Sequence, residues 1–486
     1  MDTKMSKPAG TPAEAAPAEG SARDLSCDVL IAGCGVAGLY AALSLPAGTD
    51  IVMLSKGAVD ECDSMLAQGG ICVLPEAGDY DAFFADTMRA GHNENRRESV
   101  DIMIRSSRSV INDLIALGTD FEREPDGGLA FTREGAHSRP RIAFHEDITG
   151  KEITETLLAA VRELPNVRIL EHVALIDLLV EGGACAGAVA VAVPEELSTR
   201  TIEELRADAS LAPFAIRAAD TVLATGGIGG VYTHSTNFPQ LTGDACFLAN
   251  EYGVKNEHLD YVQIHPTGLY SEKPGRTFLI SESCRGEGAV LLDRAGERFT
   301  DELQPRDVVA AAIRRQMAAD GTEYEWLSFK NVGPEVITGH FKNIREHCLE
   351  DQGRDILRDP IPVTPTQHYF MGGVHVDRDS ETTMPNLYAA GETACNGVHG
   401  KNRLASNSLL ESLVFARRAS WKIATGESLP VEEAGEPALD GRHRPLGDGR
   451  QNIDALLAAR AAAGDRDVAG ARPAEPRPAA ADPAAR

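Results

Sequence analysis

The first motif that indicates a chemical function is a glycine-rich turn near the N-terminus. Gly33-Cys34-Gly35-Val36-Ala37-Gly38 follows a buried apolar run and precedes a helical pattern. Glycines at this spacing allow a tight turn and a close approach of the backbone to a pyrophosphate. The free N–H groups and the positive dipole end of the following helix favour the same anion. The turn therefore predicts a dinucleotide-binding site.

The residues after the next strand indicate which dinucleotide is bound. An NAD enzyme usually has a carboxylate about 20 residues beyond the glycines, where it accepts hydrogen bonds from the ribose. This chain has Ser55-Lys56 at that point, which argues against a plain NAD dehydrogenase. Ser55 and Lys56 could hold ribose hydroxyls or phosphate, or they could form only a solvated strand end.

Two more glycine turns close apolar strands far along the chain. They are Thr225-Gly226-Gly227 and Gly391-Glu392. Taken singly, each would be an ordinary turn. Together with the first turn, they suit a long dinucleotide that lies across one sheet.

The elements that must position these turns predict a doubly wound α/β sheet. Buried strands at 27–32 and 51–54 flank a helix at 39–45, which is a β-α-β unit. A helix from Ser99, its predicted N-cap, ends at Gly118. Further elements are a helix at 153–164, a strand at 167–170, a hairpin of 173–180 and 184–193 joined at Gly182-Gly183, strands at 221–224 and 386–390, and a helix at 408–423.

Composition limits the classes of function. With 43% apolar and 25% charged residues and no apolar run near the ~18 residues of a membrane span, the chain is typical of soluble proteins. A net charge of −26 opposes binding to nucleic acid and to anionic membranes. It would also repel an anionic substrate, so such a substrate would need a local cluster of Arg and His. Alternatively, the acidity serves only solubility.

Cysteine usage and the leader suggest a cytoplasmic protein. There are nine cysteines, without a C-x-x-C pair, so neither a metal site nor a disulfide framework is expected. The first residues are rich in Ala, Pro, Gly and Glu and lack the apolar segment of a secretory signal.

Nine motifs occur in an order that resembles the succinate dehydrogenase and fumarate reductase flavoprotein superfamily. They are Gly33 to Gly38, Ser55-Lys56-Gly57, Ala67-Gln68-Gly69-Gly70, Ala224 to Gly227, His265-Pro266-Thr267-Gly268, Arg285-Gly286-Glu287-Gly288-Ala289, Pro305-Arg306-Asp307, His368-Tyr369-x-Met371-Gly372-Gly373 and Arg403-x-Ala405-Ser406-Asn407-Ser408-Leu409. The resemblance runs from about Leu25 to Ile423.

The resemblance implies an α/β fold in which a Rossmann-like FAD-binding domain carries an inserted α+β capping domain. The expected divisions are a disordered leader at 1–24, the FAD-binding domain at 25–258 and 370–425, the capping domain at 259–369, and a mostly disordered, low-complexity tail at 426–486. The family normally has a helical domain in place of this tail, so dimer contacts stay open.

The cofactor implied by the resemblance is FAD. Its expected ligands are Gly33, Cys34, Gly35, Val36, Ala37, Gly38, Ser55, Lys56, Ser64, Ala67, Gln68, Gly69, Gly70, Val173, Thr225, Gly226, Gly227, Asp244, Glu392, Asn407, Ser408 and Leu409. Covalent members have a His five residues before the Gln of the Ala-Gln-Gly-Gly motif. Asp63 stands there in this chain, so the resemblance predicts non-covalent FAD.

Within the superfamily, the segment Thr132 to Ser138 is similar to that of the L-aspartate oxidases. Its Glu134 matches the residue thought to face the substrate amino group. An ammonium group beside a flavin needs an anion as its partner. The alternative is that Glu134 is only a surface carboxylate.

The resemblance also assigns the other substrate contacts. His265, His368 and Arg403 match residues that hold carboxylates, Ser281 and Glu282 match a substrate loop, and Arg306 matches a proton carrier. An Arg rarely releases a proton, so Arg306 needs an acidic helper, such as Glu287 or Asp307, or acts only as an electrostatic clamp. A site formed from both domains should close over its substrate.

The implied reaction is the oxidation of L-aspartate to iminoaspartate, with dioxygen or fumarate as the oxidant. Iminoaspartate would pass to quinolinate synthase in the first steps of NAD synthesis. Two alternatives stay open. One is a fumarate reductase or succinate dehydrogenase flavoprotein, and the other is a flavin-binding protein without turnover.

Overall fold

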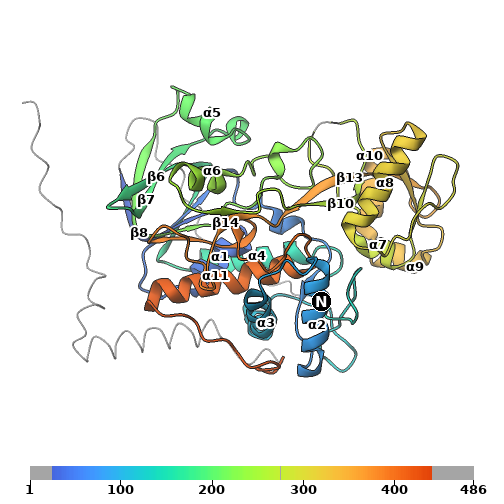
Figure 1. Cartoon of the computed structure of the whole chain (residues 1–486), viewed down its shortest axis with the longest axis horizontal. Coiled ribbons are helices and arrows are strands. Elements are labelled where there is room, and N and C mark those ends of the chain that lie inside the picture. Colours follow the sequence, from blue (N-terminus) through green and yellow to red (C-terminus); the bar gives the residue numbers. More distant parts are fainter. Residues whose placement is uncertain (1–23, 274, 440–486) are drawn as a thin grey trace, which may run out of the picture.

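The computed structural model describes residues 24–273 and 275–439 of the 486-residue chain. The predicted leader, apart from Asp24, and the greater part of the predicted tail lie outside the described residues. Two bodies are visible in Figure 1, a large one built on the N-terminal sheet and a smaller one on the right that contains α8 and α10.

The large body is built on the predicted doubly wound sheet. β1 (Leu25–Ala32) pairs in parallel with β2 (Ile51–Ser55) and with β8 (Phe214–Leu223). β2 also pairs in parallel with β5 (Val167–Glu171), and β8 with β15 (Leu387–Ala389). Because parallel strands share one direction, the glycine turns after β1, β8 and β15 meet at the same edge of this sheet.

The predicted hairpin is confirmed at the other side of the sheet. β6 (Val173–Glu181) and β7 (Ala184–Ala192) are antiparallel and are joined by Gly182 and Gly183, both with positive φ. β7 continues the sheet next to β8, giving the order β5-β2-β1-β8-β7-β6.

Four helices bury one face of the sheet in a common apolar core. They are α1 (Val36–Ser44), α3 (Arg97–Leu117), α4 (Thr149–Arg162) and α11 (Asn407–Thr425). Gly118 ends α3 in the left-handed region, as predicted. The predicted cap of α3 is wrong: the helix begins two residues before Ser99, whose hydroxyl donates to the backbone oxygen of Asn396 at 2.7 Å.

Shorter elements complete the large body. They are η1 (Asp63–Leu66), β3 (Ile71–Cys72), η2 (Ala77–Asp79), α2 (Tyr80–Ala90), β4 (Ile142–Ala143), η3 (Glu195–Leu197), α5 (Ile202–Ala207), η4 (Gly229–Val231), α6 (Asp244–Glu251), β9 (Asn256–Glu257), β14 (Gly373–His375), η5 (Gly391–Thr393) and β16 (Ala394–Cys395).

The smaller body is a capping lobe with its own core. Its antiparallel sheet has the order β10-β13-β12-β11 and consists of β10 (Val262–Leu269), β13 (Ile361–Phe370), β12 (Glu325–Ser328) and β11 (Val290–Leu292). The helices α7 (Glu282–Gly286), α8 (Arg306–Asp320), α9 (Pro334–Gly339) and α10 (Lys342–Gln352) surround it.

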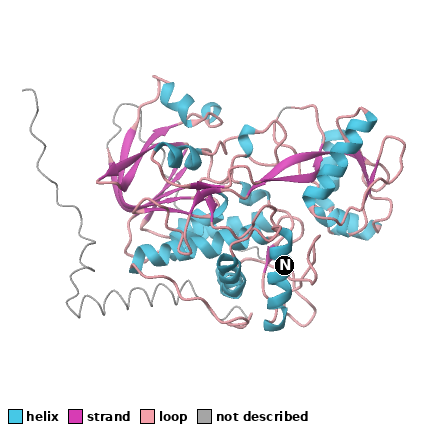
Figure 2. Cartoon of the chain, viewed as in Figure 1, coloured by secondary structure: helices cyan, strands magenta, loops and turns pink. Residues whose placement is uncertain are grey.

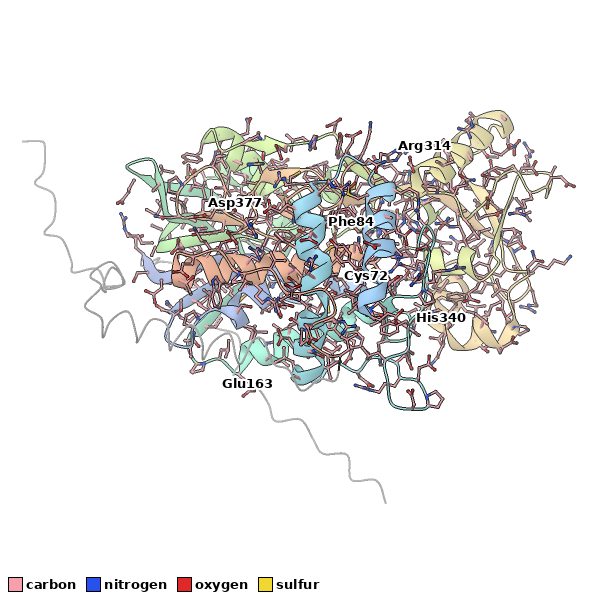
Figure 3. All side chains as sticks on the ribbon, turned by 60° about the horizontal axis from the view of Figure 1, so that its bottom comes forward. Cys72, Phe84, Glu163, Arg314, His340 and Asp377 are labelled. Atoms are coloured by element: carbon pink, nitrogen blue, oxygen red, sulfur yellow. The ribbon has the colours of Figure 1, made fainter. Side chains whose placement is uncertain are left out.

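The two bodies are connected through β10 and β13. Figure 2 shows these strands crossing from the large body to the helices of the cap. In Figure 3, Arg314 and His340 lie on the cap side, and Asp377 lies on the large body. A side chain at the inner end of either strand can therefore reach groups of both bodies.

Part of the predicted tail is packed on the large body. Arg108 of α3 donates to the backbone oxygen of Pro437, and Asn112 donates to that of Ala438 at 2.7 Å. Ser109 donates to Glu432 at 2.5 Å. Residues 427–439 thus form a strap along α3. Because this segment is neither helix nor strand, side chains of α3 supply hydrogen-bond donors to its backbone oxygens.

Candidate active site

One cavity brings most of the predicted site residues together. It encloses about 1650 Å³, part of it open to solvent, and it extends from the glycine turn of the large body to the cap. The site residues predicted from the sequence that line this cavity are Gly33, Cys34, Gly35, Val36, Ala37, Ser55, Lys56, Ser64, Ala67, Gln68, Gly69, Gly70, Glu134, Val173, Thr225, Gly226, Asp244, His265, Ser281, Glu282, Arg306, His368, Glu392, Arg403, Ser408 and Leu409.

Three residues of the predicted FAD set do not line this cavity. Gly38 lies in α1 against Gly33, Gly227 lies against Glu392, and the buried Asn407 donates to the hydroxyl of Thr87 at 3.2 Å. Their places behind the wall suit packing roles, while a cofactor contact for them stays a prediction.

The dinucleotide end of the cavity is shaped by close backbone contacts. A Cβ on Gly33, which has φ +120°, would lie 2.0 Å from the backbone oxygen of Ala224. A Cβ on Gly38 would lie 2.0 Å from the oxygen of Gly33. The first turn of α1 carries no acidic residue, and its N-terminus faces the cavity. Together these features form the backbone cradle that a pyrophosphate needs.

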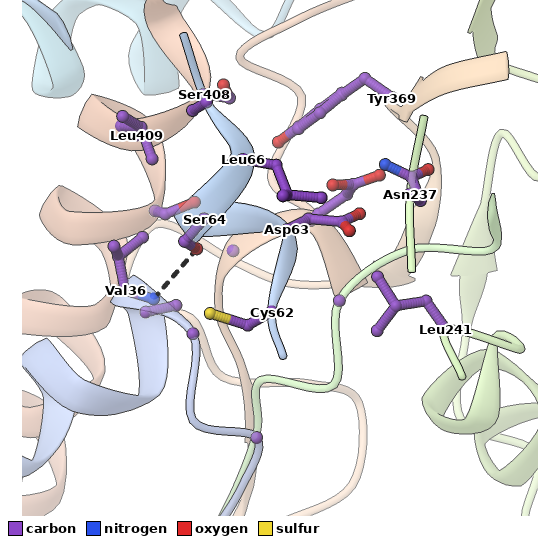
Figure 4. A pocket seen from close by; sticks show the side chains of 18 of the residues that line it. Val36, Cys62, Asp63, Ser64, Leu66, Asn237, Leu241, Tyr369, Ser408 and Leu409 are labelled. Carbon is purple, nitrogen blue, oxygen red and sulfur yellow. Dashed lines mark hydrogen bonds between the residues drawn. The ribbon is translucent and has the colours of Figure 1, made fainter. Parts of the chain in front are cut away.

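Other walls of this end are held by polar contacts. The backbone N–H of Val36 donates to the hydroxyl of Ser64 at 3.2 Å, the dashed line in Figure 4. The Lys56 ammonium group donates to Asp244 at 2.9 Å and to Thr242 at 2.8 Å. Lys56 is therefore not a free solvated end, although its predicted contact with the cofactor stays a prediction.

Two buried acids lie deeper in the cavity. Asp63, visible in Figure 4, accepts the N–H of Phe238 at 2.8 Å, and burial raises its pKa to about 7. Glu392 accepts the N–H of Phe370 at 2.9 Å, and burial and Asp63 raise its pKa well above the usual range. Within the described residues, one oxygen of Asp63 and the side-chain oxygen of Gln68 are buried without a partner. Such atoms fit a cofactor with a polar ring edge.

The cap contributes a buried ion pair. The Nε of Arg306, the first residue of α8, donates to Glu282 at 2.5 Å, and its Nη1 donates to Gln263 at 2.9 Å. Burial opposes the ionisation of Glu282, but Arg306 and Arg285 outweigh it and lower its pKa to about 2. Glu282 is therefore ionised and forms an ion pair with the guanidinium of Arg306.

The acidic helpers expected for Arg306 were the wrong ones. Glu287 is exposed, and Asp307 lies 3.3 Å from the imidazole of His92. The carboxylate that contacts Arg306 is Glu282. Asp307, the second residue of α8, does not line the cavity, whereas Glu282, the first residue of α7, does.

The two predicted histidines lie together, with ring centroids 5.2 Å apart. The backbone N–H of Thr267 donates to Nδ1 of His265 at 3.2 Å, so Nε2 of His265 carries the proton when the ring is neutral. That Nε2 is buried without a partner in the described part of the chain. Nδ1 of His368 lies 2.8 Å from the hydroxyl of Thr236.

These histidines are neutral hydrogen-bonding groups rather than cations. Burial and the charge of Arg306 lower the pKa of His265 and of His368 well below the usual range. Beside these histidines, the positive charge that the described residues offer a dicarboxylate is that of arginine.

Arg403 is the second arginine of the site. Its guanidinium carbon lies 4.6 Å from the ring centroid of Tyr369, and its Nη1 donates to Ser408 at 3.0 Å. Burial and Arg306 lower the pKa of Arg403 to about 10, so it stays charged at neutral pH. Its Nε is buried without a protein partner in the described residues, which leaves a donor for a carboxylate.

Glu134 faces the same space from the large body. Its side chain accepts a hydrogen bond from Ser406 at 2.6 Å, and the residue is only 6% exposed. Burial and the carboxylate of Glu282 raise its pKa. The alternative of a surface carboxylate is therefore wrong. A Cβ on Gly69 would lie 2.2 Å from Glu134, so this glycine makes room for the acid.

Three residues of the site were missed from the sequence. Gln263 bridges the lobes, because its Oε1 accepts from Arg306 while its Nε2 donates to Asn402 and to the backbone of Arg403. Its position two residues before His265 on a strand was a usable signal, since alternate residues share a face. Tyr369 and Ser406 both lie inside motifs already recognised.

No metal or membrane site accompanies this cavity in the described part of the chain. Residues 24–273 and 275–439 contain no group of three or more His, Cys, Asp or Glu side chains placed to hold a metal ion. They also contain no helix that is both long and apolar enough to cross a membrane.

Fold and site define a flavoprotein of the two-lobed kind, with FAD as its cofactor. A family model described as an FAD binding domain matches residues 28–409. A solved quinol-fumarate reductase with menaquinol has a TM-score of 0.74 and 29% identity, and the match covers 90% of this chain and 76% of that one.

Curated relatives narrow the class. The L-aspartate oxidase of Clostridium perfringens is 45% identical over 397 residues, which is 82% of this chain and 86% of the relative. That of Neisseria meningitidis serogroup B is 42% identical, over 85% of this chain and 80% of the relative. The chain belongs to the L-aspartate oxidase family.

Proposed function

We propose that this chain oxidises L-aspartate to iminoaspartate, with dioxygen or fumarate as the electron acceptor. Dioxygen would be reduced to hydrogen peroxide and fumarate to succinate, so each turnover moves two electrons and two protons. The observation that carries the proposal is the position of Glu134, a buried carboxylate that shares its cavity with Arg306 and Arg403. That set of charges complements a dicarboxylate with an ammonium group.

Each side chain has a proposed task. Arg403 pairs with a substrate carboxylate, and His265 donates from its free Nε2. Glu134 pairs with the ammonium group and is the base for the proton that the nitrogen loses, a role that its raised pKa favours. Because Arg306 is bonded to Glu282 and a guanidinium rarely releases a proton, we assign Arg306 an electrostatic role in aspartate oxidation. Ser281 begins the short helix that carries Glu282.

The chemistry that FAD supplies when bound is two-electron transfer from the substrate to the acceptor. The residues proposed to hold it are those of the predicted FAD set that line the cavity. We propose a non-covalent complex, since Asp63 stands where covalent relatives have a nucleophilic His. Acid precipitation should leave the yellow colour in the supernatant, and a yellow pellet would contradict this.

The proposal is tested by anaerobic mixing of the yellow protein with L-aspartate, followed by absorbance. We expect the flavin to bleach with L-aspartate, and much less with succinate. Bleaching by succinate alone would favour a succinate dehydrogenase or fumarate reductase. A folded, flavin-loaded protein that neither compound bleaches would favour a binding protein without turnover.

The product suggests the cellular setting. Iminoaspartate is an unstable imine, so we propose that it passes to quinolinate synthase in NAD synthesis. We place the reaction in the cytoplasm, supported by the nine cysteines, all of which are free. A pull-down with quinolinate synthase, with and without aspartate turnover, tests the first point.

A further inference from the structure

Ser406 has an unusual place at the start of α11. It is the N-cap residue, and it has φ +61° and ψ +6°, in the left-handed region that disfavours side chains. A serine at this position usually accepts a hydrogen bond from the helix backbone. Here the side chain makes no such cap and donates instead to Glu134 at 2.6 Å. The strained backbone thus directs a hydroxyl toward the site.

The surroundings of Glu134 make this one hydroxyl important. Glu282 on α7 opposes the charge of Glu134, while Arg306 on α8 and Arg403 before α11 favour it. The thiol of Cys72 on β3 also faces it. Arg306 is already bonded to Glu282. Ser406 therefore makes the one side-chain hydrogen bond to the Glu134 carboxylate in the part of the chain that the structure describes.

We propose that Ser406 is a positioning residue for substrate specificity, whose hydroxyl holds the Glu134 carboxylate in the orientation that receives the substrate ammonium group. The inference rests on the proposed oxidation of aspartate. It predicts that Ser406 matters for ligands with an ammonium group and not for dicarboxylates without one. A residue that only supported the fold would affect both kinds of ligand.

Ser406→Gly and Ser406→Ala form a matched pair for the test. Both remove the hydroxyl, but glycine adopts the left-handed backbone without strain and alanine does not. We expect both variants to raise the KM for L-aspartate about tenfold, the effect of one lost hydrogen bond to a charged group. The Kd of succinate, measured by its perturbation of the flavin spectrum, should change less than about twofold.

The pH profile gives a second measurement. A hydroxyl that donates to a carboxylate stabilises its ionised form, so losing the bond raises the pKa of Glu134 further. Aspartate binding requires the ionised form. The acidic limb of kcat/KM should therefore move to higher pH by about one unit in both variants, the equivalent of a tenfold effect.

The outcomes are distinguishable. If Ser406→Gly keeps the KM and pH profile of the parent protein, the hydroxyl has no positioning role and the inference is overturned. Equal losses for aspartate and succinate would also overturn it. If the parent protein itself is not bleached by aspartate, the proposed function and the inference fail together. Flavin content and thermal melting of each variant report whether it has folded.

Discussion

Replacing Glu134 by glutamine should separate the two halves of substrate recognition. The amide keeps the shape of the side chain and removes the charge that we assign to the substrate ammonium group. Truncating one partner of a buried charge pair costs about 2–5 kcal/mol. Because Glu134 is only 6% exposed, we expect the substitution to cost about 3 kcal/mol of transition-state binding. This loss lowers kcat/KM for L-aspartate about a hundredfold.

The same change should stabilise the folded protein. A carboxyl group whose folded pKa is raised, as for Glu134, costs stability that develops as pH rises from its unfolded to its folded pKa. Glu134→Gln removes that cost, so its melting temperature should exceed that of the parent at pH 8. The difference should vanish below the unfolded pKa of a glutamate, about 4.3.

Stopped-flow bleaching by aspartate, steady-state fumarate reduction and thermal melting measure these effects on one sample. Fumarate carries no ammonium group, so its reduction should fall much less than aspartate oxidation. An equal fall in both reactions would refute the role of Glu134. A lower melting temperature at pH 8 would refute the electrostatic reasoning.

Three shorter predictions follow from other contacts. Arg403→Leu should raise the Kd of both aspartate and succinate at least a hundredfold, measured by flavin spectra, and an unchanged Kd for either would contradict the carboxylate clamp. Glu282→Gln should lower fumarate reduction about a hundredfold, because it breaks the 2.5 Å pair with Arg306; full activity would exclude Glu282 as a helper. Gly33→Ala should give a protein purified without flavin, since its Cβ would meet Ala224 at 2.0 Å, and a normal yellow colour would contradict the assigned turn.

The sequence was most informative where local chemistry requires a particular backbone. Gly33 and Gly118 were predictable, because a tight turn and a left-handed helix end leave few alternatives to glycine. Ser99 misled the prediction, because its hydroxyl is used by Asn396, a residue far away in sequence. The expectation that a serine caps the helix considers only neighbouring residues, whereas the hydroxyl of Ser99 donates to the distant backbone oxygen of Asn396.

The electrostatic state of the site could not be predicted from residue types. His265 and His368 were expected as basic groups, but their charge depends on burial and on the nearness of Arg306. Their protonation is a property of the assembled cavity. The strap at 427–439 is a similar case, because its acidic, Glu-containing sequence gives no sign that α3 provides donors for its backbone.

The substrate that this cavity accepts depends on which of its charged side chains are already paired. Glu282 is bonded to Arg306, so the carboxylate left for the substrate is that of Glu134. Open donors beside it in the described residues are Nε of Arg403 and Nε2 of His265. A ligand with an ammonium group and two carboxylates satisfies both. Succinate satisfies the arginine but leaves a buried carboxylate without a counter-charge, and a polar group left unpaired costs more than a weak contact gains. Discrimination against succinate thus arises from what Glu134 loses, so dicarboxylates without an ammonium group, fumarate included, should bind more weakly than aspartate even though their carboxylates fit.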